Sequence, residues 1–357
     1  MSSPNLRAFI DAMAAEPWHY DYFAALRWLD ASQPTKPRLG TARRPADEPV
    51  RLGQPPEASF APATLHAVDK GSGGRPPRIE VRFFGLFGPN GPLPLHLTDY
   101  ARTRILHHGD HTFARFADLF HHRMLLLFYR AWAQAQPVVG LDRPGDDRFA
   151  DMVGSLIGIG RPQFRGRDAA PDHVKLHFAG LFTRHVRNAD GLANVLSGYL
   201  RRRARVEPFA GHWMALQEDE RSRLGQRIGL RRNDGARLGQ GAVAGRMVWD
   251  RQHAFRVHIG PMDLEGFEAL LPSGTALPAV MSLVQQYVGY EFEWDLLLGL
   301  DVAQLKPAQL GRYGRLGWTS WAGKPPRRAV AELRLSPEPA MAAWQRRRRT
   351  GAPHPSH

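Results

Sequence analysis

Histidine is the residue type in this sequence that most readily suggests chemistry, because five histidines fall within one short stretch. They are His107, His108, His111, His121 and His122. His107 and His111 have the i, i+4 spacing of two metal ligands on one helix face. Asp110 and Asp118 are available as carboxylate ligands or partners. Gly109 interrupts the first group, however, and the last two histidines are adjacent and so point to different sides of a helix. We therefore expect no metal site.

Other motifs that carry catalysis or hold cofactors are missing from the sequence. It has no cysteine, no Gly-Lys-Ser/Thr phosphate loop and no Gly-x-Ser-x-Gly elbow. Gly239-Gln240-Gly241 faintly resembles a phosphate loop, but a predicted strand follows it, so no helix N-terminus would receive the phosphate. The acidic groups Asp146-Asp147 and Glu218-Asp219-Glu220 lie among arginines, without the apolar surroundings that tune a carboxyl group for acid-base catalysis. We predict no catalytic residues and no cofactor.

The chain is strongly basic, with a net charge of +14 and an isoelectric point near 10.7. Five of its 48 basic residues are lysines and the other 43 are arginines. Genomic base composition explains such an excess, and so does a partner of opposite charge, either nucleic acid phosphate or an acidic protein surface. Arginine also suits bidentate protein contacts. A basic nucleic-acid-binding protein therefore remains the alternative function, although aromatic residues interleave with the basic ones only faintly, from Arg205 to Trp213.

The hydrophobic content of 43% is that of a globular protein. No run of 18 apolar residues and no charged-then-apolar leader occurs, so we expect neither a membrane span nor a secretory signal. The absence of cysteine fits a cytoplasmic protein.

The histidines lie in the stretch around which the rest of the chain is organised, from Val81 to Trp132. It opens with a short aromatic strand, 79–88, and turns through the three prolines and Asn-Gly pair of residues 89–96. A helix of about 24 residues is predicted from Thr112, capped by Thr112 or Asp110 and ended by Pro137. Its apolar residues cover nearly all faces, which predicts burial on more than one side by other elements or other chains.

The segments before this stretch are helical, then irregular. Residues 6–29 predict one or two helices broken at Pro17, crowded with aromatic side chains that suit either a core or a partner contact. Residues 33–61 contain many prolines and predict an extended arm without regular structure. Residues 70–78 predict a loop.

The segments after it alternate between helix and strand. A weak helix is predicted over 149–157, a strand over 174–178, a helix over 188–200 and an extended stretch over 204–216. Residues 80–87 and 175–182 align without gaps, which leaves a degenerate duplication open. Residues 246–260 predict a hairpin that turns at 251–253. A helix capped by Asp263 and a helix from Pro278 are predicted to follow it. A strand is then predicted over 290–296, with one solvent-exposed, acidic face. Residues 312–326 are interrupted by several glycines and contain Trp318 and Trp321. The basic tail is predicted to be disordered.

These elements predict an α+β fold, with an N-terminal helical part, an extended Pro-rich arm and C-terminal strand-helix-strand units in an antiparallel or mixed sheet. We divide the chain into residues 1–62 (helix and arm), 63–140 (strand-turn and long helix), 141–300 (α+β domain), 301–336 (Trp-bearing segment) and 337–357 (basic tail).

Several motifs of the chain resemble the TssG family, a baseplate subunit of bacterial type VI secretion systems. The two longest are Phe83-Phe84-Gly85-Leu86-Phe87-Gly88-Pro89-Asn90-Gly91-Pro92-Leu93-Pro94-Leu95-His96 and residues 116–132, FADLFHHRMLLLFYRAW. Shorter ones are Tyr22 to Leu29, Val248 to Gln252, Ile259 to Met262 and Leu316 to Trp321. The resemblance spans most of residues 6–322.

The resemblance implies a structural protein without catalytic residues. Such proteins join two copies of TssF in a wedge that binds TssE and TssK trimers, around the spike hub and beneath the contractile sheath. It implies a cytoplasmic location at the inner face of the cytoplasmic membrane, with no small-molecule substrate. It also gives exposed aromatic and turn residues a use as partner contacts. The candidates are Trp18, Tyr22, Phe23, Trp28, Phe87, Pro89, Asn90, Trp318 and Trp321.

Overall fold

The computed structural model describes residues 6–71, 73–218, 220–222, 245–309, 311–321 and 330–337. The glycine-rich stretch Gly239-Gln240-Gly241, the end of the 312–326 segment and the tail from 338 lie outside these residues. The chain forms two compact units, residues 1–152 and 153–357. Within the described part, no helix has the length and apolar character needed to cross a membrane.

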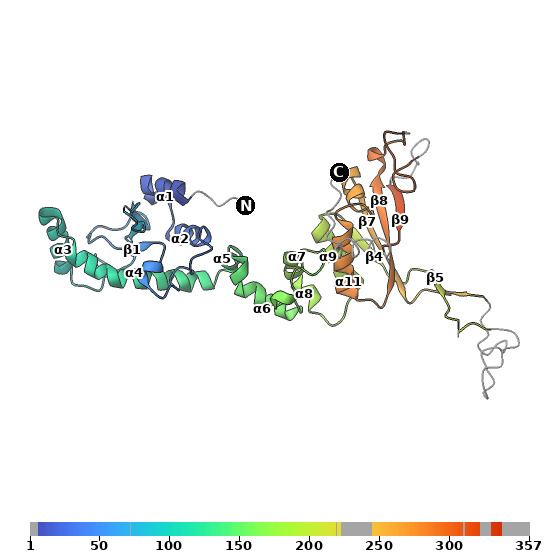
Figure 1. Ribbon diagram of the computed structural model, residues 1–357, viewed down its shortest axis with the longest axis horizontal. Helices are drawn as coiled ribbons and strands as arrows, with labels where there is room; N and C mark the ends of the chain where they lie inside the picture. The colour runs from blue at the N-terminus through green and yellow to red at the C-terminus, as the bar shows by residue number, and fades with distance from the viewer. Residues whose placement is uncertain are drawn as a thin grey trace, which may run out of the picture. The chain divides into compact units, whose positions relative to one another are not determined.

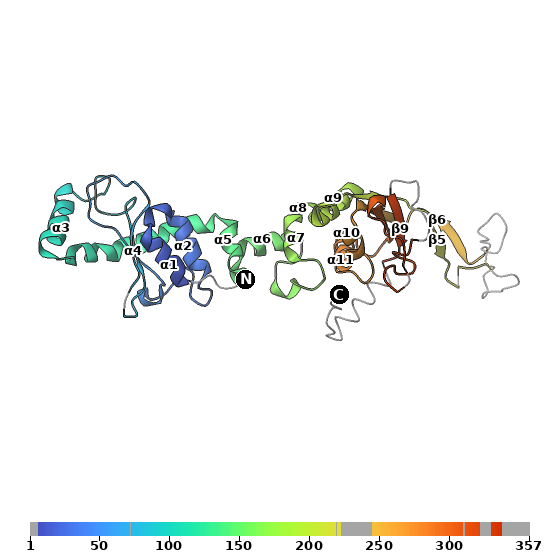
Figure 2. The same ribbon diagram turned by 90° about the horizontal axis from the view of Figure 1, so that it is seen from above.

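The first unit packs helices around a small sheet. Its elements are α1 (Leu6–Ala15), η1 (Pro17–His19), α2 (Tyr22–Ala31), η2 (Pro45–Asp47), β1 (Arg51–Gly53), β2 (Leu65–Asp69), β3 (Arg78–Val81), α3 (Leu95–His108), α4 (Thr112–Gln134), α5 (Pro137–Leu141), η3 (Pro144–Asp146) and α6 (Arg148–Leu156), which crosses the boundary between the units. The strand order is β1-β3-β2, with β1 parallel and β2 antiparallel to β3. Helix α4 packs on β1, and α2 lies beside the C-terminal half of α4 in both views (Figure 1, Figure 2).

The core of this unit joins residues that are far apart in the sequence. Tyr22 is fully buried, and its hydroxyl donates to the Leu125 carbonyl oxygen at 2.8 Å, which ties α2 to α4. Leu39 and Leu52, from the predicted arm, are buried in the same cluster. The expectation of an arm without regular structure was therefore wrong at β1. Its prolines exclude long elements, but its apolar residues still reach the core.

Helix α4 confirms the predicted long helix almost to the residue. Asp110 Oδ1 accepts the Thr112 amide at 3.0 Å just before the helix, although the N-cap position itself is His111, whose side chain makes no capping hydrogen bond. Elements of the described chain cover only one side of α4, and cover of the other sides by other chains stays a prediction. One face is buried, and the opposite face exposes large apolar side chains.

The second unit packs helices against a mixed four-stranded sheet. Its elements are η4 (Pro162–Phe164), α7 (Asp172–His177), α8 (Ala179–Phe182), α9 (Ala189–Leu200), β4 (Ala204–Glu207), β5 (His212–Ala215), β6 (Met247–Asp250), β7 (Ala254–Met262), α10 (Leu264–Ala269), α11 (Leu277–Val288), β8 (Glu293–Asp301), η6 (Val302–Gln304) and β9 (Val330–Leu335). The sheet order is β4-β7-β8-β9, with only the β7 and β8 pair parallel. Buried side chains of α9, α10 and α11 form one core cluster with those of the sheet, and α9 and α11 lie along one side of it in Figure 1. The predicted α+β fold with a mixed sheet is confirmed.

Three predictions for this unit were wrong. Residues 174–178 are helical, since Val174 and Phe178 also fit one helix face and Lys175 pairs with Asp172 one turn away at 3.0 Å. The proposed duplication fails with it, because residues 80–87 form a strand and turns. Strands β6 and β7 do not form a hairpin, because β6 pairs with β5 and β7 with β4 and β8.

The last predicted strand is displaced. Tyr290 and Phe292 are exposed in a turn, and β8 begins at Glu293 and runs to Asp301. Its core-facing residues are Leu296, Leu298 and Leu300. Asp263 caps α10 as predicted, accepting from Gly266 N, and Asn188 caps α9 by accepting from Gly191 N.

Candidate partner-binding surface

The two longest motifs of the sequence meet in one hydrogen-bond network on the buried side of α4. His121 is fully buried, and its Nε2 accepts the Leu86 amide at 2.9 Å. Its Nδ1 therefore carries the proton and donates to Asp118 Oδ1 at 3.1 Å. Asp118 Oδ1 also accepts the Gln54 amide at 3.0 Å. One turn of α4 thus holds both the loop after β3 and the end of β1.

The loop itself is held by its backbone. Gln54 accepts the Phe87 amide through Oε1 and donates from Nε2 to the Phe87 carbonyl, both at 2.9 Å. Gly88 N donates to Thr98 Oγ1 at 3.2 Å. Gly85 has a φ of +148°, and a Cβ there would collide with the Gln54 side chain and lie 3.1 Å from His121 Nε2. The glycines of this motif are therefore required by close packing, and the exposed Pro89 and Asn90 form its tip.

His122 makes a related contact on the next position of α4. Its Nδ1 accepts the Leu52 amide at 3.2 Å, so the folded chain needs the neutral imidazole. Burial, and then the charges of Arg51 and Arg123, lower the pKa of His122 from 6.5 to about 4.

The lowered pKa predicts a pH dependence of stability. Between pH 6.5 and 4 the unfolded chain binds a proton at His122 and the folded chain does not, so the free energy of unfolding should fall as the pH falls through this window. His122→Asn keeps an acceptor near Nδ1 and cannot be protonated. Urea unfolding at pH 7 and pH 5 should therefore show a smaller loss for His122→Asn than for the wild type. The exposed His107→Asn is the control and should leave the loss unchanged.

The other histidines do not converge with carboxylates into a metal site. His107, His108 and His111 are exposed. Among the residues that the structure describes, no group of three His, Asp or Glu side chains is arranged to hold a metal ion.

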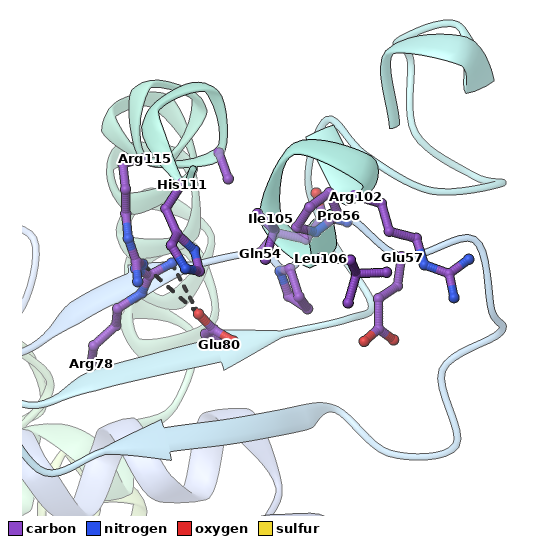
Figure 3. Close-up of a pocket in the computed structure, with 12 residues that line it drawn as sticks. Gln54, Pro56, Glu57, Arg78, Glu80, Arg102, Ile105, Leu106, His111 and Arg115 are labelled. Atoms are coloured by element: carbon purple, nitrogen blue, oxygen red, sulfur yellow. Dashed lines mark ion pairs between the residues drawn. The ribbon is translucent and has the colours of Figure 1, made fainter. Parts of the chain in front are cut away.

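A pocket of about 250 Å³ lies between β3, α3 and the start of α4. On one side of it Arg78, His111 and Arg115 gather around Glu80, and Arg102 and Glu57 lie on the other side (Figure 3). Glu80 pairs with Arg78 at 3.1 Å and with Arg115 at 3.8 Å. These charges compensate one another, which suits a structural junction and leaves no isolated carboxyl group for acid-base chemistry.

The outer face of α4 exposes large apolar side chains. Four of its side chains at helical spacing are between 43% and 68% exposed, namely Phe116, Leu119, Phe120 and Leu127. We call them the α4 ridge. Phe116 and Phe120 meet edge to face with ring centroids 5.6 Å apart. On α3, Leu95, Tyr100 and Leu106 are also exposed. Contiguous apolar exposure of this kind marks protein interaction sites.

A second exposed surface lies on the two-stranded ribbon of β5 and β6. Trp213 faces Trp249 across the ribbon, their rings 5.4 Å apart, and they are 59% and 53% exposed. The Trp249 ring also lies on Gly211, which leaves no room for a Cβ there. An isolated two-stranded ribbon is only marginally stable in water, so contact with a partner would stabilise it.

The predicted interface residues lie in different environments. Trp18 is exposed, as are Pro89 and Asn90. Phe23 and Trp28 are half-buried on α2, and Trp318 and Trp321 pack against the core of the second unit. Tyr22 and Phe87 are buried, so they support a surface from beneath. Neither the α4 ridge nor the tryptophan pair was among the surface residues predicted from the sequence. The helical period of apolar residues in α4 was the signal that could have indicated the ridge.

A comparison of the sequence with protein families identifies the family of this chain. The family model described as "Type VI secretion, TssG" matches residues 16–323. The chain belongs to the TssG family of type VI secretion. No sequence among functionally curated proteins matches this TssG-family chain.

Solved structures share the fold of this TssG-family chain. A chain of "The baseplate complex from the type VI secretion system" is 20% identical, aligned over 92% of this chain and 93% of its own length, with a TM-score of 0.57. A chain of the TssK-TssF-TssG baseplate subcomplex, determined by cryo-electron microscopy, is also 20% identical, over 61% of this chain and 90% of its own length, with a TM-score of 0.50.

Proposed function

We propose that this chain is a structural subunit of a type VI secretion baseplate that acts by binding other proteins. The observation that carries the proposal is the α4 ridge, whose large apolar side chains are exposed although the opposite face of the same helix is fully packed. Membership of the TssG family supports it, as does the fold shared with chains of type VI baseplate complexes. The proposed partners are two copies of TssF, TssK trimers and TssE. The assembly would lie in the cytoplasm at the inner face of the cytoplasmic membrane, next to the spike hub and sheath.

The network around His121 suits a scaffold. It fixes the backbone of residues 86–88 through buried side chains of α4, α3 and Gln54, the residue that follows β1. Because the backbone next to them is already fixed, exposed residues such as Pro89 and Asn90 would lose little conformational entropy when they bind a partner.

The charge of the chain fits protein partners as well as it fits nucleic acid. Many arginines already pair with carboxylates of the same chain, including Arg27 with Asp142, Arg143 with Asp30 and Arg256 with Asp295. Phosphate binding needs arginines that are free to replace counterions.

Co-purification with TssF, TssK and TssE from the same genome tests the proposed function. We expect a stable complex that holds two TssF copies for each copy of this chain and survives 300 mM salt, since apolar contacts are not screened. A monomer that ignores these proteins would contradict the proposal. Binding to DNA that weakens steeply between 50 and 200 mM salt would favour the nucleic-acid alternative instead.

A further inference from the structure

A pocket of about 420 Å³ lies between α2, the end of α4 and α5, away from the His121 network. Its walls include the aromatic side chains of Phe23, Trp28 and Trp132. The rings are held in place by packing. Phe23 stacks on Trp132 with centroids 4.8 Å apart, and Trp28 stacks on Phe9 at 3.7 Å. A ligand would therefore meet aromatic faces that are already ordered.

The charged residues of this pocket leave one carboxylate uncompensated. Asp142 is bound by Arg27 through two hydrogen bonds, at 2.6 and 2.9 Å, so these two charges cancel. Asp21 caps α2, accepting the Phe23 and Ala24 amides through Oδ2 at 2.9 and 3.2 Å. Its side chain is exposed, and within the described part of the chain it forms no ion pair with a cation. The helix N-terminus offsets only part of its charge.

Aromatic faces beside a free carboxylate favour a cationic ligand. A guanidinium or ammonium group gains roughly 0.5–2 kcal/mol over an aromatic face, and a guanidinium also pairs with a carboxylate in a planar fork. We propose that this pocket binds an arginine or lysine side chain of a partner protein. The proposal rests on the proposed function for the existence of that partner. An acidic side chain would be repelled by Asp21, and a purely apolar one would gain nothing from it.

A probe of the isolated full-length chain tests the chemistry without any partner. N-acetyl-arginine-methylamide and its citrulline analogue have nearly the same shape, and only the first is charged. We expect the arginine probe at millimolar concentration to shift the indole NMR signals of Trp28 and Trp132, assigned with Trp28→Phe and Trp132→Phe, and the citrulline probe to shift them at least fivefold less. Equal shifts, or none from either probe, would overturn the proposal.

Asp21→Asn tests the same site in the assembled complex. Asparagine is as good a helix cap as aspartate, so the variant should fold and lose only the charge. We expect a 5- to 20-fold weaker affinity for the TssF and TssK complex at 50 mM salt and a smaller loss at 300 mM. Asp301→Asn makes the same change at the cap of η6, where the exposed Asp301 accepts the Ala303 amide and forms no ion pair within the described residues, and it should have no effect. An unchanged or tighter complex for Asp21→Asn contradicts a cationic ligand, whereas a wild-type chain that binds no partner contradicts the proposed function.

Discussion

Phe120→Glu combined with Leu127→Glu is expected to prevent assembly with baseplate partners while leaving the fold intact. Both side chains lie on the α4 ridge, about half exposed and two turns apart. Burial of each side chain in an interface contributes roughly 1.5–3 kcal/mol, and each glutamate would place a charge in the contact. The affinity for the TssF and TssK complex should therefore fall at least 100-fold, which corresponds to about 2.7 kcal/mol.

A matched control separates this effect from that of added charge. Gln134→Glu with Gln136→Glu adds the same two charges at exposed polar positions near the end of α4, and it should bind like the wild type. Thermal unfolding of both free variants should match the wild type, since glutamate is a good helix former. If the ridge variant still co-purified at wild-type yield, the α4 ridge would not be the partner-binding surface.

His121→Ala is expected to produce the largest loss of stability among the substitutions considered. It removes a fully buried ring, leaves the Leu86 amide without its acceptor and takes away one of the hydrogen bonds to Asp118, which keeps those from Gln54 and Arg78. An unsatisfied buried group and a cavity together cost about 3 kcal/mol or more. Hydrogen exchange should accelerate in peptides that contain Leu86 to Gly88, and the midpoint of urea unfolding for the first unit should fall.

Two comparisons make the His121 experiment specific. His121→Gln can place its Oε1 near the position of Nε2, so it should retain part of the stability. The exposed His108→Ala should cost almost nothing. Exchange within α11, which belongs to the second unit, serves as an internal reference and should not change. Unaltered exchange at Leu86 to Gly88 in His121→Ala would show that the loop is held by other contacts.

Elements whose signals are local were predicted well. The bounds of α4 follow from its helical period and Pro137, the start of α11 from Pro278, and the cap of α10 from Asp263. These signals act within one or two turns, so the sequence contains all of the information they need.

Features that depend on distant residues were predicted poorly. The period at Val174 and Phe178 fits a strand or a helix in so short a segment. Strand β6 pairs with β5, which lies more than thirty residues earlier in the chain, so this pairing depends on distant residues. The same limit applies to the α4 ridge, because its apolar period shows that a face needs cover and does not show whether the cover comes from the same chain. Tyr22 and Phe87 looked like contact residues because burial is not visible in composition.

The place of β9 in the sheet has a consequence for synthesis. The strands of the first unit are complete at Val81 and its long helix at Gln134, so this unit can fold while the ribosome is still at work, as N-terminal domains do. Strand β8 gains its second neighbour only from Val330–Leu335. Until the ribosome has released those residues, β8, which carries Leu296, Leu298 and Leu300, is a bare sheet edge. A chain truncated shortly before Val330 would therefore be prone to aggregation, although it would contain most of the residues of the protein.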